Sequence, residues 1–152
     1  MGSNAEVAWS FFELLSRGRI DEALAVLDDD GTWWHVRTRR AYPMRRHKRQ
    51  LARAWSIVPL QFTRFRTVED GDTVVLELAS HAQLPGGGAY DNRYVYVVTM
   101  GAGTLLHVRE YSDTAYGDRV LTPEIQALFA DAAAESAAAE EAEAEAESDG
   151  GG

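Results

Sequence analysis

The second half of the chain contains four long runs of residues that favour β-strands, and each run is separated from the next by a short turn. The runs are rich in valine, tyrosine, threonine and leucine, and they span residues 61–68, 73–83, 90–100 and 105–114. The segments EDGD, LPGGG and GAG between them are typical of hairpin turns. The sequence therefore predicts a meander of long antiparallel strands, and the rest of the fold has to be built against that sheet.

The first half has a different periodicity, because its apolar residues recur at the spacing of amphipathic helices. This spacing predicts a helix that begins near the capping residue Asn4 and ends at Gly18, a second helix that starts at Ile20, and a third over residues 46–57. The stretch TWWHV predicts a short strand before the third helix. Helices followed by a meander indicate an α+β fold, in which the helices cover one face of the sheet and a pocket can form between the layers.

Composition excludes several classes of protein. A chain of 152 residues with 45% hydrophobic content has the size of one domain. Because the chain has no cysteine, it cannot form a disulfide or a thiolate metal site, and we expect a cytoplasmic protein. No apolar run approaches the roughly 20 residues of a membrane-spanning helix, so no membrane partner is expected. The histidines lack the spacing of a zinc site, and no metal is expected.

Charge is distributed unevenly along the chain. The net charge is −9, but eight acids lie between Asp131 and Asp149, whereas eight of the fifteen cations lie within residues 37–53. This basic segment has a proline at its centre and few aromatic residues, so nucleic acid is not an expected partner, and a solvated helix face is the simplest interpretation. Two sharper alternatives stay open. The segment could bind an anionic group of a substrate, or it could receive the acidic tail of the same chain.

The same patterns divide the chain into three parts. Residues 1–122 are predicted to form the single domain. Residues 123–130 are predicted to form a short helix that packs through Ile125, Leu128 and Phe129. Residues 131–152 alternate alanine and glutamate without an apolar face, so we expect a flexible tail or a frayed, solvated helix.

Two stretches carry a resemblance to a known family. They are LSRGRIDEALAVLDDDGTW, and YDNRYVYVV followed by a turn and LLHVREYSD. Together they resemble the SnoaL-like branch of the nuclear transport factor 2-like superfamily, which includes polyketide cyclases, ketosteroid isomerase and limonene epoxide hydrolase. The resemblance covers about residues 4–116. It implies a cone of three N-terminal helices packed on a curved, mostly antiparallel sheet, and acid–base chemistry on a largely apolar small molecule without a cofactor.

The resemblance also implies which side chains face the inside of the cone. His35 falls where ketosteroid isomerase has its proton-shuttling aspartate. The catalytic candidates are two imidazoles and a carboxylate, which can exchange protons near neutral pH: His35, His81 and Glu110. The substrate-binding candidates share an expected inward position: Trp33, Trp55, Glu77, Asp91, Arg93, Val95, Val108 and Ser112. Each of these also has an ordinary structural interpretation, as core or as part of an ion pair.

Departures from the family patterns leave the reaction open. Phe11 and Val95 stand where ketosteroid isomerase has the two hydrogen-bond donors for its enolate oxygen, so steroid isomerisation is not expected. Glu110 matches one carboxylate of the epoxide hydrolases, but His81 and Ala79 replace the second carboxylate and the arginine. Two functions remain: a cyclase, isomerase or hydratase/hydrolase, and a non-catalytic module that binds a small ligand or dimerises.

Members of this superfamily commonly pair through the outer face of the sheet. The predicted register places Tyr94, Tyr96, Val98 and Tyr111 on that face, where a monomer would leave an aromatic patch in water. We therefore expect a homodimer.

Overall fold

A computed structural model describes residues 3–150, apart from the side chains at positions 128–137 and 140. The helices of this range are α1 (Asn4–Ser16), α2 (Ile20–Ala25), α3 (Met44–Ile57), α4 (Thr114–Val120) and α5 (Pro123–Asp149). Its strands are β1 (Leu27–His35), β2 (Arg40–Pro43), β3 (Gln61–Asp70), β4 (Thr73–Gln83), β5 (Ala89–Met100) and β6 (Leu105–Ser112).

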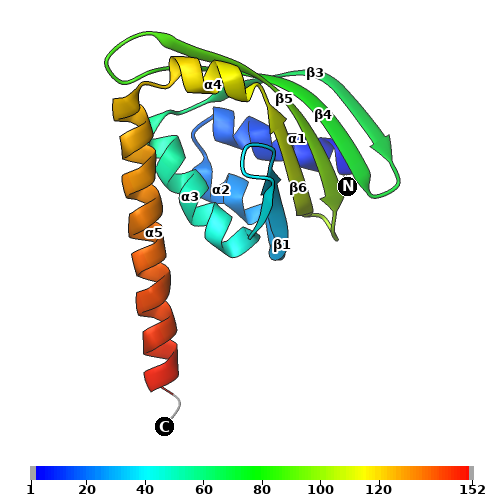
Figure 1. Ribbon diagram of the computed structural model, residues 1–152. Helices are drawn as coiled ribbons and strands as arrows, with labels where there is room; N and C mark the ends of the chain where they lie inside the picture. Colours follow the sequence, from blue (N-terminus) through cyan, green and yellow to red (C-terminus); the bar gives the residue numbers. More distant parts are fainter. Residues whose placement is uncertain (1–2, 151–152) are drawn as a thin grey trace.

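The six strands form one curved sheet in the order β2-β1-β6-β5-β4-β3. The sheet is mixed, because β1 runs parallel to β6 while the other neighbouring strands pair antiparallel. Helices α1, α2 and α3 lie on the same side of the sheet, within its curve (Figure 1). The predicted α+β fold is confirmed, with the predicted meander running from β3 to β6.

The acidic stretch after the second helix belongs to β1 and does not end a helix. Helix α2 stops at Ala25, and β1 begins at Leu27, which pairs with Leu105 of β6. Gly31 permits this pairing, because a Cβ at that position would lie 1.6 Å from the carbonyl oxygen of Leu106. The close approach brings β1 against β6, and β6 carries the residue that becomes central to the site.

The inner face of the sheet carries the core. On β4 the buried side chains alternate through Val74, Leu76 and Leu78, and on β5 they alternate through Tyr94 and Tyr96. These residues pack with Phe11 and Phe12 of α1 in one cluster. The alternation is the reverse of the register implied by the resemblance for these two strands. A shift of one residue sends every side chain of a strand to the opposite face.

This reversal corrects the predicted placement of several residues. The candidates that point outward instead of into the cone are Glu77, His81, Asp91, Arg93 and Val95, all of which are exposed. The expected dimer patch changes as well, because Tyr94, Tyr96 and Val98 are buried on the inner face. Tyr111 does lie on the outer face, where its ring packs against Trp34 with 5.1 Å between the ring centroids.

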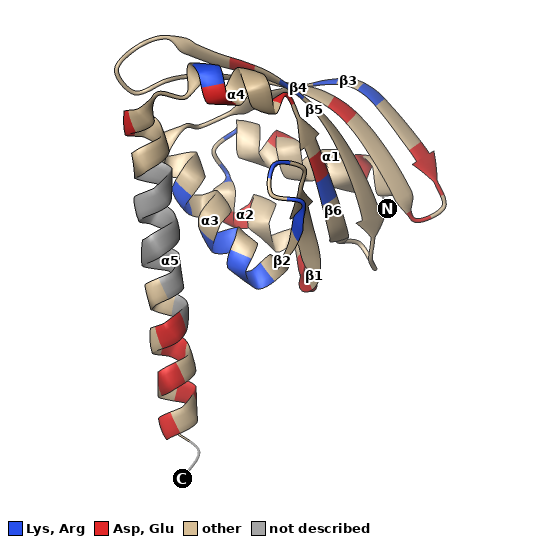
Figure 2. Cartoon of the chain, viewed as in Figure 1, with Lys and Arg blue, Asp and Glu red and all other residues tan. Residues whose placement is uncertain are grey.

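Helix α5 extends over both the predicted short helix and the predicted tail. Its first turn packs through Ile125, which is buried with Val58, the residue that follows α3. The predicted packing of Leu128 and Phe129 lies outside the described side chains. In Figure 2, Lys and Arg residues of α3 are blue, and the acidic residues of α5 are red. Arg49 of α3 pairs with Glu143 of α5 at 2.5 Å. Of the alternatives for the basic segment, contact with the acidic tail of the same chain is thus present in the structure.

Other cations of the basic segment pair with the acids of β1. Nζ of Lys48 lies 2.7 Å from Oδ1 of Asp29, and Nη2 of Arg45 lies 3.8 Å from Oδ1 of Asp30. Within the described residues, none of the helices combines the length and the apolar character required to cross a membrane.

Candidate functional site

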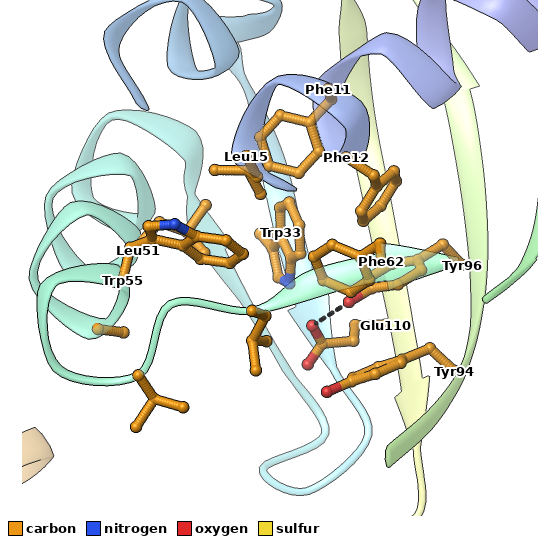
Figure 3. Close-up of a pocket in the computed structure, with 13 residues that line it drawn as sticks. Phe11, Phe12, Leu15, Trp33, Leu51, Trp55, Phe62, Tyr94, Tyr96 and Glu110 are labelled. Carbon is orange, nitrogen blue, oxygen red and sulfur yellow. Dashed lines mark hydrogen bonds between the residues drawn. The ribbon is translucent and has the colours of Figure 1, made fainter. Parts of the chain in front are cut away.

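A cavity of about 190 Å³ lies between the inner face of the sheet and helices α1 and α3 (Figure 3). Its wall is largely aromatic, and the rings come from α1, β1, α3, β3 and β5: Phe11, Phe12, Trp33, Trp55, Phe62, Tyr94 and Tyr96. The aliphatic part of the wall is Leu15, Leu51, Ala54, Val58 and Leu60. Among the described residues that line the cavity, Glu110 alone has a carboxylate or a cationic group.

Two hydrogen-bond donors hold the Glu110 carboxylate. Oε1 accepts a hydrogen bond of 2.9 Å from the hydroxyl of Tyr96, which lies opposite Glu110 on β5 (Figure 3). Oε2 contacts Nε2 of His35, which lies beside Glu110 on the neighbouring strand β1. The pairing of three adjacent strands therefore assembles the group, and all three side chains point to the inner face.

The proton of His35 can be placed from its neighbours. The backbone N–H of Arg37 donates a hydrogen bond of 3.0 Å to Nδ1 of His35. Nδ1 is then an acceptor, so the neutral ring carries its proton on Nε2 and donates it to Glu110. His35 does not line the cavity. Its position behind the carboxylate makes it a residue that orients Glu110.

The surroundings of Glu110 favour its ionised form. Burial alone would raise the pKa of the Glu110 carboxyl. The hydrogen bond and the electrostatic attraction from His35, together with the hydrogen bond from Tyr96 and a smaller attraction from His47, outweigh burial, so this pKa lies below its usual value. Burial, together with the adjacent carboxylate, raises the pKa of Tyr96 well above its usual value. Tyr96 therefore stays protonated and continues to donate, and the cavity contains a carboxylate at neutral pH.

Two further polar side chains lie beside this group without a described hydrogen-bond partner. The ring of His47 on α3 stacks on Trp33 with 4.4 Å between centroids, and both ring nitrogens of His47 are buried and unpaired among the described residues. Burial lowers the pKa of His47 to about 4, so its imidazole is neutral at pH 7. The indole Nε1 of Trp33 is also buried and unpaired. Such groups are stabilised when a ligand supplies the missing hydrogen bond.

The structure brings together some of the predicted site residues and separates others. Trp33, Trp55 and Glu110 line the cavity, and His35 contacts Glu110 from behind. Val108 is fully buried on the inner face next to Trp33. Ser112 is paired with Tyr94 at the end of β6, and neither Val108 nor Ser112 is part of the described cavity wall.

The second predicted imidazole lies on the other side of the sheet. His81 pairs with Asp91 through its Nδ1, at 2.5 Å, and the two side chains are 52% and 62% exposed. Glu77, Arg93 and Val95 are on this outer face as well. None of these five side chains can reach the inner cavity without crossing the sheet, so their predicted roles in a site shared with His35 are wrong.

Sequence reasoning missed His47 and Tyr96. His47 was treated as one more member of the basic segment, although Met44, His47, Leu51 and Trp55 recur at helical spacing and share the inner side of α3. Tyr96 was assigned to the outer face. The alternation of Tyr94, Tyr96 and Val98 along β5 was the available signal for its inward position.

Comparisons with known proteins identify the fold. A family model described as a SnoaL-like domain matches residues 9–108. No curated protein sequence matches the chain significantly. A solved nuclear transport factor 2-like protein of unknown function from Burkholderia pseudomallei superimposes with a TM-score of 0.68 and 17% identity, covering 80% of this chain and 99% of that chain.

Two other solved structures show the same architecture. TerC, co-crystallised with polyporic acid, has a TM-score of 0.67 and 18% identity, covering 77% of this chain and 96% of that chain. An LEH-like epoxide hydrolase from Mycobacterium tuberculosis has a TM-score of 0.67 and 22% identity, covering 76% and 86%. The family model spans more than half of the sequence, and the chain therefore belongs to the SnoaL-like domain family, with the nuclear transport factor 2-like fold.

Proposed function

We propose that this protein is an enzyme that performs acid–base chemistry on a small, largely apolar molecule without a cofactor, with Glu110 as the group that accepts the proton. The observation that carries the proposal is a single ionised carboxylate in an aromatic cavity, oriented by His35 and Tyr96. Two donors fix the carboxylate but leave it further acceptor capacity for a substrate X–H. General bases of this kind contribute roughly 100- to 10,000-fold to a rate.

The proton taken by Glu110 would return to the same molecule. In an isomerisation or cyclisation, the substrate gives a proton to the carboxylate oxygen and receives one at a different atom, so its overall composition is unchanged. The charge that develops on a substrate oxygen needs a donor. Trp33 lines the cavity and its Nε1–H has no partner in the described part of the chain, so this N–H would donate where Phe11 and Val95 lack a donor.

The test uses a small ketone, because removal of a proton beside a carbonyl requires only a base and a donor. Phenylacetone in D2O reports this step as exchange of its benzylic hydrogens, followed by NMR. We expect exchange above the buffer rate with the wild type, a decrease of about 100-fold or more in Glu110→Gln, and no decrease in Glu141→Gln, which makes the same change on the exposed surface of α5. Exchange at the buffer rate, or equal exchange in Glu110→Gln, would exclude Glu110 as the base.

The alternative function is a module that binds a small ligand without converting it. One observation favours it: the described cavity wall has a single carboxylate and no imidazole, because His35 lies behind Glu110 and His81 lies outside. A binding module would hold phenylacetone, as detected by calorimetry, without accelerating its exchange.

We also propose that the protein forms a homodimer through the outer face of the sheet. Phe65 and Val95 are 53% and 39% exposed there and, with Tyr111, line one surface hollow. Burying this surface against a second copy would remove apolar area from water. Sedimentation should show a dimer at micromolar concentration for the wild type and a monomer for Phe65→Asp, whereas a wild-type monomer would rule out the pairing.

A further inference from the structure

Among the described residues that line the cavity, none has a positive charge to balance Glu110. Glu110 is ionised, and the rest of the described cavity wall consists of apolar side chains and two tyrosines. A carboxylate in such surroundings is destabilised unless an opposite charge or several hydrogen bonds compensate it. Tyr96 and His35 supply two hydrogen bonds to Glu110, and full compensation would require a positively charged group beside the carboxylate.

Neither nearby imidazole lines the cavity. His35 lies behind Glu110, where its Nδ1 accepts a hydrogen bond of 3.0 Å from the backbone N–H of Arg37 and its Nε2 contacts the carboxylate. His47 is neutral at pH 7, because burial holds its pKa at about 4. Among the described residues that line the cavity, the carboxylate of Glu110 is therefore the one charged group, and it has no cationic neighbour on the cavity wall.

The walls of the cavity are suited to a positive charge. Seven aromatic rings line it, and the faces of aromatic rings are negative because of their quadrupole. A cation that is close to ring faces and shielded from water gains more than a cation at the surface does. The aromatic wall and the single carboxylate thus favour the same kind of ligand.

We propose that the cavity selects a ligand with one positive charge on a largely apolar body, namely a protonated or quaternary amine. The ammonium group would lie against Glu110, and the apolar body would pack among the rings of Phe12, Trp33 and Phe62. The proposal rests on the proposed function in placing the ligand at Glu110, and it adds the chemical class of that ligand.

Cavity size limits the apolar body. Apolar protein cavities of about 150 Å³ bind benzene. At about 190 Å³, this cavity has room for one six-membered ring with a short substituent. Three probes of one shape and the same number of heavy atoms isolate the effect of charge: N,N-dimethylbenzylamine, which is protonated at pH 7, isobutylbenzene, which is neutral, and 1-phenyl-2-propanol, which is neutral but donates a hydrogen bond.

The experiment compares the affinities of these probes by NMR titration of the full chain at pH 7. We expect the wild type and the control Glu141→Gln to bind the protonated amine at least about tenfold more tightly than either neutral probe. In Glu110→Gln the preference should fall to less than about threefold. The wild-type comparison decides the proposal even if Glu110→Gln does not fold.

Two results would overturn the proposal. Isobutylbenzene binding to the wild type as tightly as the amine would show that the cavity recognises shape alone. The alcohol binding as tightly as the amine would show that Glu110 recognises a hydrogen-bond donor and not a charge. Both results leave the phenylacetone exchange unaffected, because phenylacetone is uncharged, so failure of the charge preference and failure of the base role are distinguishable.

Discussion

The protein contains two histidine–carboxylate pairs that use the same chemistry on opposite faces of one sheet. His35 and Glu110 face inward, and their side chains are 26% and 15% exposed. His81 and Asp91 face outward, and their side chains are 52% and 62% exposed. The difference in exposure, more than the identity of the residues, decides what each pair can do.

Among the described residues, the side chains of the inner pair have further hydrogen bonds, whereas the side chains of the outer pair have none beyond their own contact. Glu110 receives a second hydrogen bond, from Tyr96, and His35 receives one from the backbone of Arg37. Aromatic rings shield the carboxylate from water, so its interactions are screened less by solvent. An exposed ion pair contributes roughly 0–1 kcal/mol, whereas a buried carboxylate depends strongly on each donor. Site chemistry is therefore expected on the inner face.

Two adjacent tryptophans provide the largest test of this contrast. Trp33 faces inward and is 2% exposed. Trp34 faces outward, and Cζ of the Arg109 guanidinium lies 4.1 Å from the centroid of its ring. Trp33→Ala should lower the free energy of unfolding by about 3–5 kcal/mol, because it leaves a cavity in the core. Trp34→Ala should lower it by about 1 kcal/mol. Urea denaturation measures both, and equal losses would show that the two faces are packed alike.

The buried imidazole of His47 should make stability depend on pH. The pKa of His47 is about 4 in the folded protein, with Glu110 and His35 as the nearest titratable groups. The unfolded chain takes up this proton below about pH 6.5, so stability is fully present above that pH. It should be lost progressively as the pH falls to about 4, by about 3 kcal/mol in total.

Substitution separates His47 from the other groups that titrate in acid. Urea denaturation of His47→Leu should show a much smaller loss between pH 6.5 and 4, a window set by the unfolded and folded pKa values of this residue. The contribution of Glu110, whose pKa is lowered, is lost only below about pH 4.5. An unchanged pH dependence in His47→Leu would contradict the buried, neutral state of this histidine.

Direct substitution of the two paired histidines gives the smallest expected effects on stability. His35→Ala should lower the free energy of unfolding by about 2 kcal/mol, because Glu110 stays buried with one donor fewer. His81→Ala should change it by less than about 0.5 kcal/mol, since both partners of that pair are exposed to water. If thermal denaturation shows the larger loss in His81→Ala, the assignment of the two environments is wrong.

Periodicity in the sequence was sufficient to predict the fold class, the meander and the three N-terminal helices. The inward position of Trp33, His35 and Glu110 was implied by the family resemblance, and in the structure Trp33 and Glu110 line the cavity while His35 contacts Glu110. β2, over Arg40–Pro43, was not predicted. A strand of four residues inside a basic segment has too little apolar alternation to indicate its pairing.

The register of β4 and β5 could have been predicted correctly from the chain itself. An inward Glu110 requires that its antiparallel neighbour Tyr96 also point inward, since residues directly opposite each other share a face. The apolar alternation of Val74, Leu76 and Leu78 indicates the same side. On both strands, the register implied by the resemblance was displaced by one residue from the register in the structure. A displacement of one residue exchanges the inner and outer faces of a strand.

Contacts between distant segments were the part that the sequence could not decide. The pairing of Arg49 with Glu143 is one of many pairings that the basic segment and the acidic tail permit by charge alone. The partner of His35 posed the same problem, because Glu110 is close to it only through the parallel pairing of β1 with β6. Charge and periodicity indicate which groups need partners, and the topology of the sheet selects them.

The ionisation of Glu110 tests the account most directly, because both the base role and the preference for a cationic ligand require a carboxylate in the cavity. A ¹³C NMR titration of the glutamate side-chain carboxyls, with Glu110→Gln used to assign the Glu110 signal, measures its pKa. The account predicts a pKa below the ordinary glutamate value of about 4.3, owing to the hydrogen bond and electrostatic attraction from His35 and the hydrogen bond from Tyr96. A pKa above that value, showing that burial prevails over the two donors, would contradict the account.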